Sequence, residues 1–67
     1  MEPYQQRIVD EKSELNEKLG RLEAFFETVV FAKLDSGEKD RLHRQRDVMW
    51  DYCNILGERI DAFTKTK

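Results

Sequence analysis

The sequence has few of the residues that hold small proteins together. Its 67 residues include one cysteine and one histidine, so a single chain forms neither an internal disulfide nor a Cys/His zinc site. No apolar run approaches the roughly eighteen residues of a membrane span, and no signal-peptide pattern is present. Chains of this size rarely stabilise themselves with a single core, so self-association is the device that remains.

The charges are numerous but balanced. Charged residues make up 39% of the chain, yet the net charge is −2 and the pI is about 5.3. A general nucleic-acid binder would show a strongly basic face instead. The free thiol of Cys53 agrees with a reducing compartment. We therefore expect a soluble cytoplasmic protein that binds neither a nucleic-acid polymer nor a membrane.

Apolar residues recur at helical spacing over the first half of the chain. Pro3 suits the first position of a helix, because its φ is fixed and its missing N–H is not needed there. The stripe consists of Ile8, Leu15, Leu22 and Val29, seven apart, with Leu19 and Phe26 in the alternate positions. Gln5 and Lys12 occupy the same alternate positions nearer the start. The spacing predicts a helix over about 3–32 with a seam that becomes polar towards its beginning.

A second helix is predicted after a break in the pattern. Asp35, Ser36 and Gly37 mark a turn over about 33–36, and Asp35 and Glu38 have the spacing of a capping box. The helix then runs over about 37–63 with a wide apolar stripe, which suits contact with more than one neighbour. The stripe comprises Leu42, Met49, Leu56 and Phe63, flanked by Val48, Ile55 and Ala62 on one side and by Cys53 and Ile60 on the other.

Two long helices joined by a short connection fold back on each other. We therefore predict an all-α fold, with residues 1–67 forming one antiparallel two-helix hairpin about 40 Å long. A lone hairpin buries one seam and leaves the flanking apolar residues exposed to water. We expect copies of the hairpin to assemble into a symmetric homo-oligomeric helical bundle.

Several residues do not fit a plain coiled coil. Gly20 and Gly57 lie inside the predicted helices, where glycine is either tolerated or closely approached by another chain or a ligand. Trp50 points away from the stripe and favours an oligomer interface. Beside the stripe, Gln45, Tyr52 and Arg59 recur seven apart and either pair with charges on neighbouring helices or line a polar pocket between hairpins.

No motif of an enzyme is present. His43 has no acid or nucleophile placed to make a catalytic set, and Cys53 falls on the buried side of its helix. The sequence has no glycine-rich phosphate loop and no metal-ligand spacing. The "RLHRQR" stretch, with Arg41, Arg44 and Arg46, is interpreted as a solvated face paired with Asp40 and Asp47. We expect no catalytic residue, no metal and no cofactor.

The beginning of the first helix carries a different chemistry. Tyr4 and Arg7 lie one turn apart with Gln5 and Gln6 between them. A π face, a guanidinium and two amides are groups that bind nucleobases and phosphates. The alternative is a helix end at which Tyr4 covers the apolar seam.

Two stretches, "YQQRIVDEKSELNEKLGRLEAF" and "LHRQRDVMWDYCNILGERI", carry a family resemblance over about residues 4–60. The chain resembles the helical-hairpin family of phage anti-defence sponges, which sequester the cyclic oligonucleotide signals of bacterial CBASS; the same hairpin occurs in Thoeris anti-defence sponges. The resemblance implies a non-enzymatic, symmetric oligomer, often a hexamer, in the cytoplasm of an infected or lysogenic host. It would bind cyclic di- or trinucleotides such as 3′,3′-cGAMP between protomers without cleaving them.

The resemblance also implies roles for particular residues. In the family, a tyrosine near the start of the long helix stacks on the base and a lysine further along holds phosphate, which here are Tyr4 and Lys18. An arginine late in the second helix serves the trinucleotide pocket, and Arg59 is its match. With Arg7 and Lys12 these residues form the predicted ligand-binding set. Tyr4 and Lys18 are about 21 Å apart along one helix, so a shared ligand would need them from two antiparallel first helices.

Two other functions stay open. The hairpin could be a structural adaptor that binds a protein partner through Trp50 and the wide stripe, or a nucleic-acid binder that uses "RLHRQR", which the acidic balance disfavours. Among sponge ligands, a cyclic di- or trinucleotide is expected rather than the ADP-ribose ring of Thoeris, since no second domain follows the hairpin.

Overall fold

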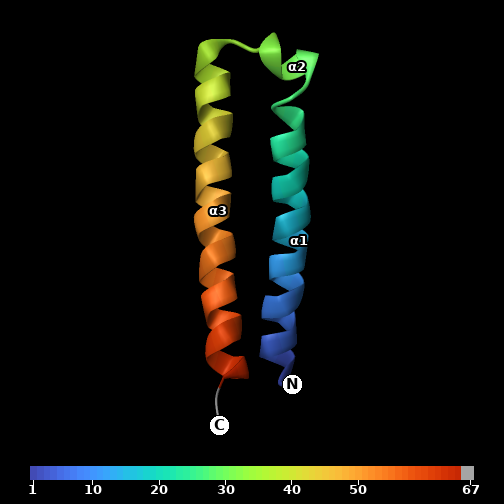
Figure 1. Ribbon diagram of the computed structural model, residues 1–67, viewed down its shortest axis with the longest axis vertical. Coiled ribbons are helices and arrows are strands. Elements are labelled where there is room, and N and C mark those ends of the chain that lie inside the picture. The colour runs from blue at the N-terminus through green and yellow to red at the C-terminus, as the bar shows by residue number, and fades with distance from the viewer. Residues whose placement is uncertain (66–67) are drawn as a thin grey trace.

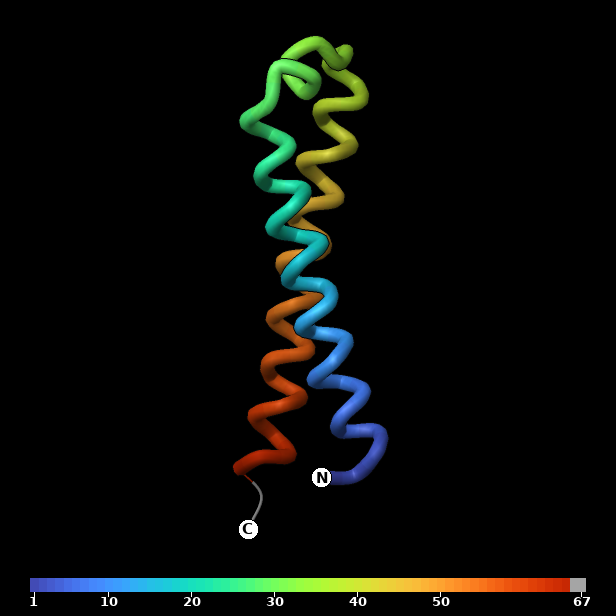
Figure 2. The backbone as a smooth tube through the Cα atoms, turned by 90° about the vertical axis from the view of Figure 1, so that its right-hand side faces the viewer, coloured from blue at the N-terminus to red at the C-terminus, as the bar shows by residue number. Residues whose placement is uncertain are grey.

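The computed structural model describes residues 1–65 and consists of helices α1 (Pro3–Phe25), α2 (Val29–Ala32) and α3 (Ser36–Thr64), with no strand in that range. The two long helices lie side by side and antiparallel, joined by α2 at one end (Figure 1). They cross near their middles in the perpendicular view (Figure 2). The molecule measures 51 × 15 × 15 Å. The predicted all-α fold and the packing of two long helices are confirmed.

The first helix begins where the proline predicts. Pro3 is the first helical residue, and the backbone N–H of Glu2 donates to Oε1 of Gln5 at 2.9 Å. This bond holds the chain at the helix entrance, in the manner of a capping box. Gln5 is half-buried, and its side-chain oxygen is used in this bond at the beginning of the helix.

The single helix predicted over about 3–32 is wrong, because α1 ends at Phe25. The hydroxyl of Thr28 donates to the Phe25 carbonyl at 2.7 Å and accepts from the Phe31 N–H at 3.2 Å. One side chain therefore closes α1 and caps α2. Thr28 is followed by Val29 and Val30, and β-branched residues weaken the preference for continuing a helix. The predicted turn over about 33–36 is only the last part of a longer connection that contains α2.

An aromatic cluster holds this connection against α3. The Phe26 ring lies 4.9 Å from the Phe31 ring and 4.7 Å from the His43 ring, measured between centroids. Phe25 meets Phe31 edge-on at 5.9 Å. His43 is exposed as a residue, but its ring packs on two phenylalanines. His43 therefore helps to hold the connection and α3 together at the closed end of the hairpin.

The helix α3 starts one residue before the predicted 37 and ends one residue after the predicted 63. Asp35 precedes it, and Oδ1 of Asp35 accepts from the Glu38 N–H at 2.7 Å. This bond satisfies one of the free N–H groups at the helix beginning and is the Asp35 half of the expected capping box.

The core lies along one seam between α1 and α3. Among residues 1–65 its buried members are Ile8, Leu19, Cys53 and Leu56, and only Leu56 of these is fully enclosed. The buried position predicted for Cys53 is confirmed, and its thiol donates to Oδ1 of Asn16 at 3.2 Å. Two helices cannot enclose more than a thin line of side chains, so this core is small for an independently stable chain. No helix in residues 1–65 is long and apolar enough to cross a membrane.

The two helix glycines differ in their surroundings. A Cβ at Gly20 would meet no atom within 4 Å, whereas a Cβ at Gly57 would lie 3.3 Å from Cε of Lys12. Gly57 therefore provides the room for a lysine stem at the seam. The side chain that approaches Gly57 is Lys12 of the same chain, and not another chain or a ligand as the sequence suggested.

Replacing Gly20 with alanine should raise the free energy of unfolding by about 0.5–1 kcal/mol, because alanine restricts the unfolded chain and enters open space. Chemical denaturation at fixed protein concentration measures the change. Gly57→Ala is the matched control and should gain less, since the Lys12 stem must move. A Gly20→Ala protein that is less stable than the parent would contradict the open surroundings of this residue and reveal contact with another chain.

Candidate ligand-binding site

A groove of about 320 Å³ lies at the open end of the hairpin, where α1 begins and α3 ends (Figure 1). It is lined by Tyr4, Ile8, Arg59, Ala62 and Phe63, and we call it the Tyr4–Arg59 groove. Ile8 is buried and forms the apolar floor, while Tyr4 is 52% exposed. Two of the sequence-predicted residues, from opposite ends of the chain, thus share one site.

The two polar members of this groove are available for a ligand. Arg59 is exposed and makes no ion pair with any residue in 1–65. A guanidinium offers five donors that match phosphate geometry, and a tyrosine ring offers a face for base stacking. The groove can therefore hold an aromatic base next to an anionic group.

The amides beside Tyr4 have local roles. Gln5 caps α1, and Nε2 of Gln6 donates to Oδ1 of Asp10 at 2.9 Å. Arg7, one turn after Tyr4, is exposed and makes no ion pair within the described residues. Of the group that the sequence singled out, Tyr4 and Arg7 remain as ligand-binding candidates.

The two lysines of the predicted set lie elsewhere. Lys12 is half-buried with its stem against Gly57, between the helices of its own hairpin. Lys18 is exposed further along α1. Because Tyr4 and Lys18 belong to one continuous helix, they stay about 21 Å apart within a chain. The structure does not bring either lysine into the Tyr4–Arg59 groove.

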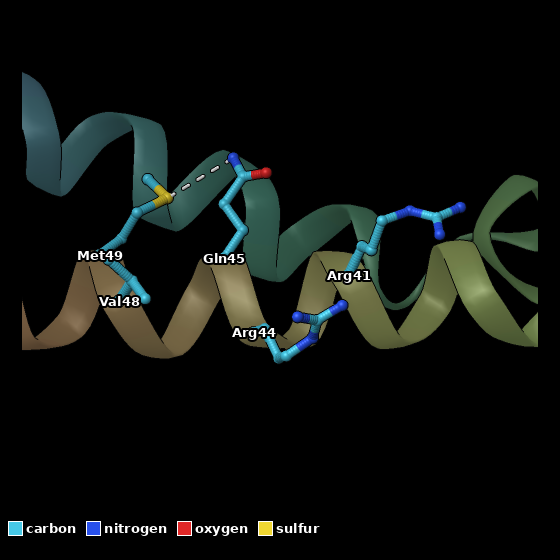
Figure 3. Close-up of a pocket in the computed structure, with 5 residues that line it drawn as sticks. All are labelled: Arg41, Arg44, Gln45, Val48 and Met49. Carbon is cyan, nitrogen blue, oxygen red and sulfur yellow. Dashed lines mark hydrogen bonds between the residues drawn. The ribbon is translucent and has the colours of Figure 1, made fainter.

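A second groove, of about 400 Å³, lies on α3 nearer the closed end. It is lined by Arg41, Arg44, Gln45, Val48 and Met49, and we call it the Arg41–Met49 groove (Figure 3). Figure 3 shows Gln45 bonded to the Met49 sulfur, at 3.9 Å, with Arg44 on the other side of the helix ribbon. Val48 is 66% exposed. Sequence reasoning missed this groove, although Val48 and Gln45 each lie beside the predicted apolar stripe.

The predicted carboxylates Asp40 and Asp47 do pair with arginines of this stretch, whereas Arg41 pairs with Glu38, which was not predicted. Each arginine binds a carboxylate close in sequence at 2.9–3.0 Å. The pairs are Arg41 with Glu38, Arg44 with Asp40, and Arg46 with Asp47. Such exposed pairs contribute little to stability and leave guanidinium donors free.

The opposite flank of the seam satisfies its polar groups within the chain. Trp50 is 48% exposed, and its indole N–H donates to Oε2 of Glu23 at 3.2 Å. The stem of Lys12 lies against Gly57 on this flank, and the seam residue Cys53 next to it donates to Asn16. The hydrogen bond to Glu23 ties Trp50 to α1 of its own chain. It does not test the interface role expected for Trp50, which stays a prediction.

The Sequestin family model matches residues 2–62, nearly the whole chain. The chain belongs to the Sequestin family. No curated protein and no solved structure matches it. The name Sequestin indicates proteins that sequester a ligand, which agrees with the sequestering function expected from the sequence. The range that the Sequestin model matches includes Tyr4 of α1 and Arg59 of α3, which line the groove from the two long helices.

The chemistry of the described residues fits this function. No group of three or more His, Cys, Asp or Glu side chains in residues 1–65 is placed to hold a metal ion. What this Sequestin hairpin does present is an aromatic ring and one guanidinium group beside the apolar residues of a groove. Groups of these kinds can stack on nucleobases and form hydrogen bonds with phosphates.

Proposed function

We propose that this Sequestin-family protein is a phage sponge that binds and sequesters a cyclic di- or trinucleotide signal of bacterial CBASS without cleaving it. The observation that carries the proposal is the Tyr4–Arg59 groove in a chain of a sequestering family. It acts in the cytoplasm of the infected host as a homo-oligomer. No cofactor takes part.

The groups of the groove suit such a ligand. Stacking of a base on an aromatic ring contributes about 1–3 kcal/mol, and guanidinium–phosphate hydrogen bonds add charge-assisted contacts. Stoichiometric capture requires a dissociation constant below the concentration of the signal. Nanomolar affinity, about −12 kcal/mol, is the expected order. A ligand with two or three bases and phosphates reaches it by using several equivalent grooves of one oligomer.

Self-association is supported by how little the hairpin buries alone. Four of the described residues form its core, while Val48, Ile55 and Val29 are each more than half exposed. Exposed apolar side chains of this number in so small a protein favour contact with further copies. A hexamer is the assembly expected from the sponge resemblance.

The same exposed residues favour a second candidate function. A structural adaptor would use Val48, Ile55 and Trp50 to bind another protein. Such an adaptor needs neither Tyr4 nor Arg59. Nucleotide binding therefore separates the two candidates.

Titration calorimetry against a ligand panel tests the sponge. The panel contains 3′,3′-cGAMP, a cyclic trinucleotide and a cyclic ADP-ribose isomer, with linear dinucleotides as controls. We expect nanomolar binding of a cyclic di- or trinucleotide and a higher melting temperature at saturation by mass action. Denaturing the complex should release the nucleotide unaltered. Binding of the ADP-ribose ring alone would retain sequestration and overturn the CBASS assignment, whereas no binding at all would favour the adaptor.

Replacing Tyr4 with alanine should weaken nucleotide binding about 10- to 100-fold, because the stacking face is lost. Tyr4→Phe is the matched control and should bind nearly as well as the parent, since it keeps the ring. Sedimentation should show the same assembly for all three proteins. Equal affinity of Tyr4→Ala and the parent would exclude Tyr4 from the site. Lys18→Ala and Arg59→Ala, measured alongside, decide which cation holds the phosphate.

A further inference from the structure

Phe63 differs in its surroundings from the other phenylalanines of the chain. Three of the four pack in one cluster at the closed end: Phe25, Phe26 and Phe31. Phe63 lies at the open end and lines the Tyr4–Arg59 groove. It stands seven residues after Leu56, the fully enclosed residue of the seam, yet it is only half-buried. The described part of the chain therefore leaves an aromatic ring partly uncovered at the end of the seam.

Apart from Ala62, the residues that line this groove form two pairs. Tyr4 and Ile8 come from the first turns of α1, and Arg59 and Phe63 come from the last turns of α3. Residues four apart lie on the same face of a helix. Because the helices are antiparallel, Tyr4 and Phe63 lie at the outer level of the groove (Figure 1). Ile8 and Arg59 lie one turn, about 6 Å, further along the hairpin towards its middle.

The space beside the two outer rings is open. Neither Tyr4 nor Phe63 is in contact with another aromatic ring among residues 1–65. The groove has a volume of about 320 Å³, near the lower end of the range for small-molecule sites. A space of this size suits a single nucleotide unit.

Both rings stand on helix ends that hydrogen bonds hold in place. At the beginning of α1, the Glu2 N–H donates to Oε1 of Gln5 at 2.9 Å. At the end of α3, the hydroxyl of Thr64 donates to the Ile60 carbonyl at 2.9 Å. Because these turns are ordered before a ligand arrives, less conformational entropy is lost on binding.

We propose that Phe63 determines the specificity of the groove: Phe63 and Tyr4 hold one purine base between their rings, and Arg59 binds the phosphate attached to it. We call the two rings the aromatic clamp. The unit that one groove recognises is then a single purine nucleoside phosphate. This inference rests on the proposed function for the class of its ligand and adds the base that is selected.

The arrangement selects an occupant that is both aromatic and anionic. Two rings can cover both faces of a base, and a purine offers a larger face for stacking than a pyrimidine. Arg59 has no ion-pair partner in residues 1–65, and its guanidinium matches phosphate geometry. Arg59 and Phe63 are one turn apart, a separation that the ribose of a nucleotide spans. An apolar occupant would use the rings and leave the cation unpaired.

Replacing Phe63 with leucine should weaken binding of each panel nucleotide that the parent binds by about tenfold or more. Leucine keeps the apolar bulk but removes one stacking face. Phe63→Tyr brings back a ring and should return the affinity to within about threefold of the parent. Phe25→Leu, the matched control, changes a half-buried phenylalanine at the closed end and should bind as the parent does. Titration calorimetry measures the affinities, and circular dichroism checks that each variant is helical.

Mononucleotides test the unit of recognition in the unaltered protein. 5′-AMP should bind at least tenfold more tightly than ribose 5-phosphate, which lacks the base, and about fivefold more tightly than 5′-CMP, whose base has a smaller face. NMR titration gives the affinities. Nuclear Overhauser effects should connect the protons of the AMP base with the rings of both Tyr4 and Phe63. Binding of 5′-AMP no tighter than that of ribose 5-phosphate, or base contacts with Tyr4 alone, overturns the inference.

The outcomes separate this inference from the proposed function. Weaker binding by Phe63→Leu, with the assembly of the parent retained in sedimentation, supports the aromatic clamp. Unchanged affinity of Phe63→Leu for a nucleotide that the parent binds overturns the clamp and leaves the sponge function standing. Loss of assembly in Phe63→Leu also overturns the clamp, because another copy would then cover this ring. A parent that binds neither a panel nucleotide nor 5′-AMP overturns both proposals.

Discussion

The burial of one narrow seam between α1 and α3 is the constraint on which the rest of this structure depends. Four side chains of the part of the chain that the structure describes are buried there, and only Leu56 of them is fully enclosed. Because the hairpin is antiparallel, the seam also fixes which residues meet across it. It brings Tyr4, which is near the beginning of the chain, to Arg59, which is near its end. The two residues are so far apart in the sequence that no local interaction could bring them together. The candidate site is thus a product of core packing.

The two flanks of the seam on α3 are unlike. On the flank of Trp50 and Gly57, polar groups find partners inside the chain: the indole N–H on Glu23 and the Lys12 stem over the glycine. On the flank of Val48 the side chains are exposed and Arg59 is unpaired within residues 1–65. A satisfied flank can face water, whereas an apolar flank that ends at the unpaired Arg59 is compatible with the proposed self-association and anion binding.

Sequestration needs this kind of site. Capture depends on complementary groups held in place before the ligand arrives, since each side chain that must be ordered on binding reduces the affinity. A helix surface provides that order at low cost in a short chain. Placing a ring and a guanidinium group on two helices that pack against each other suits the sequestering role that the family name indicates.

Local signals in the sequence determined the all-α hairpin and the bounds of α3. These signals are the helical spacing of the apolar residues, which repeats many times along the chain, the proline at the beginning of α1 and the Asp35 cap of α3. Arg59 could be singled out as a polar residue beside the apolar stripe, and Tyr4 as the aromatic member of the group at the beginning of the first helix. The end of α1 could not be predicted, since it depends on one hydroxyl of Thr28 and on rings from three segments packing together. Only the tertiary structure decided that Tyr4 and Arg59 share a groove while Lys12 lies against Gly57, because both facts follow from the register of two helices, which is set by how their side chains fit in space.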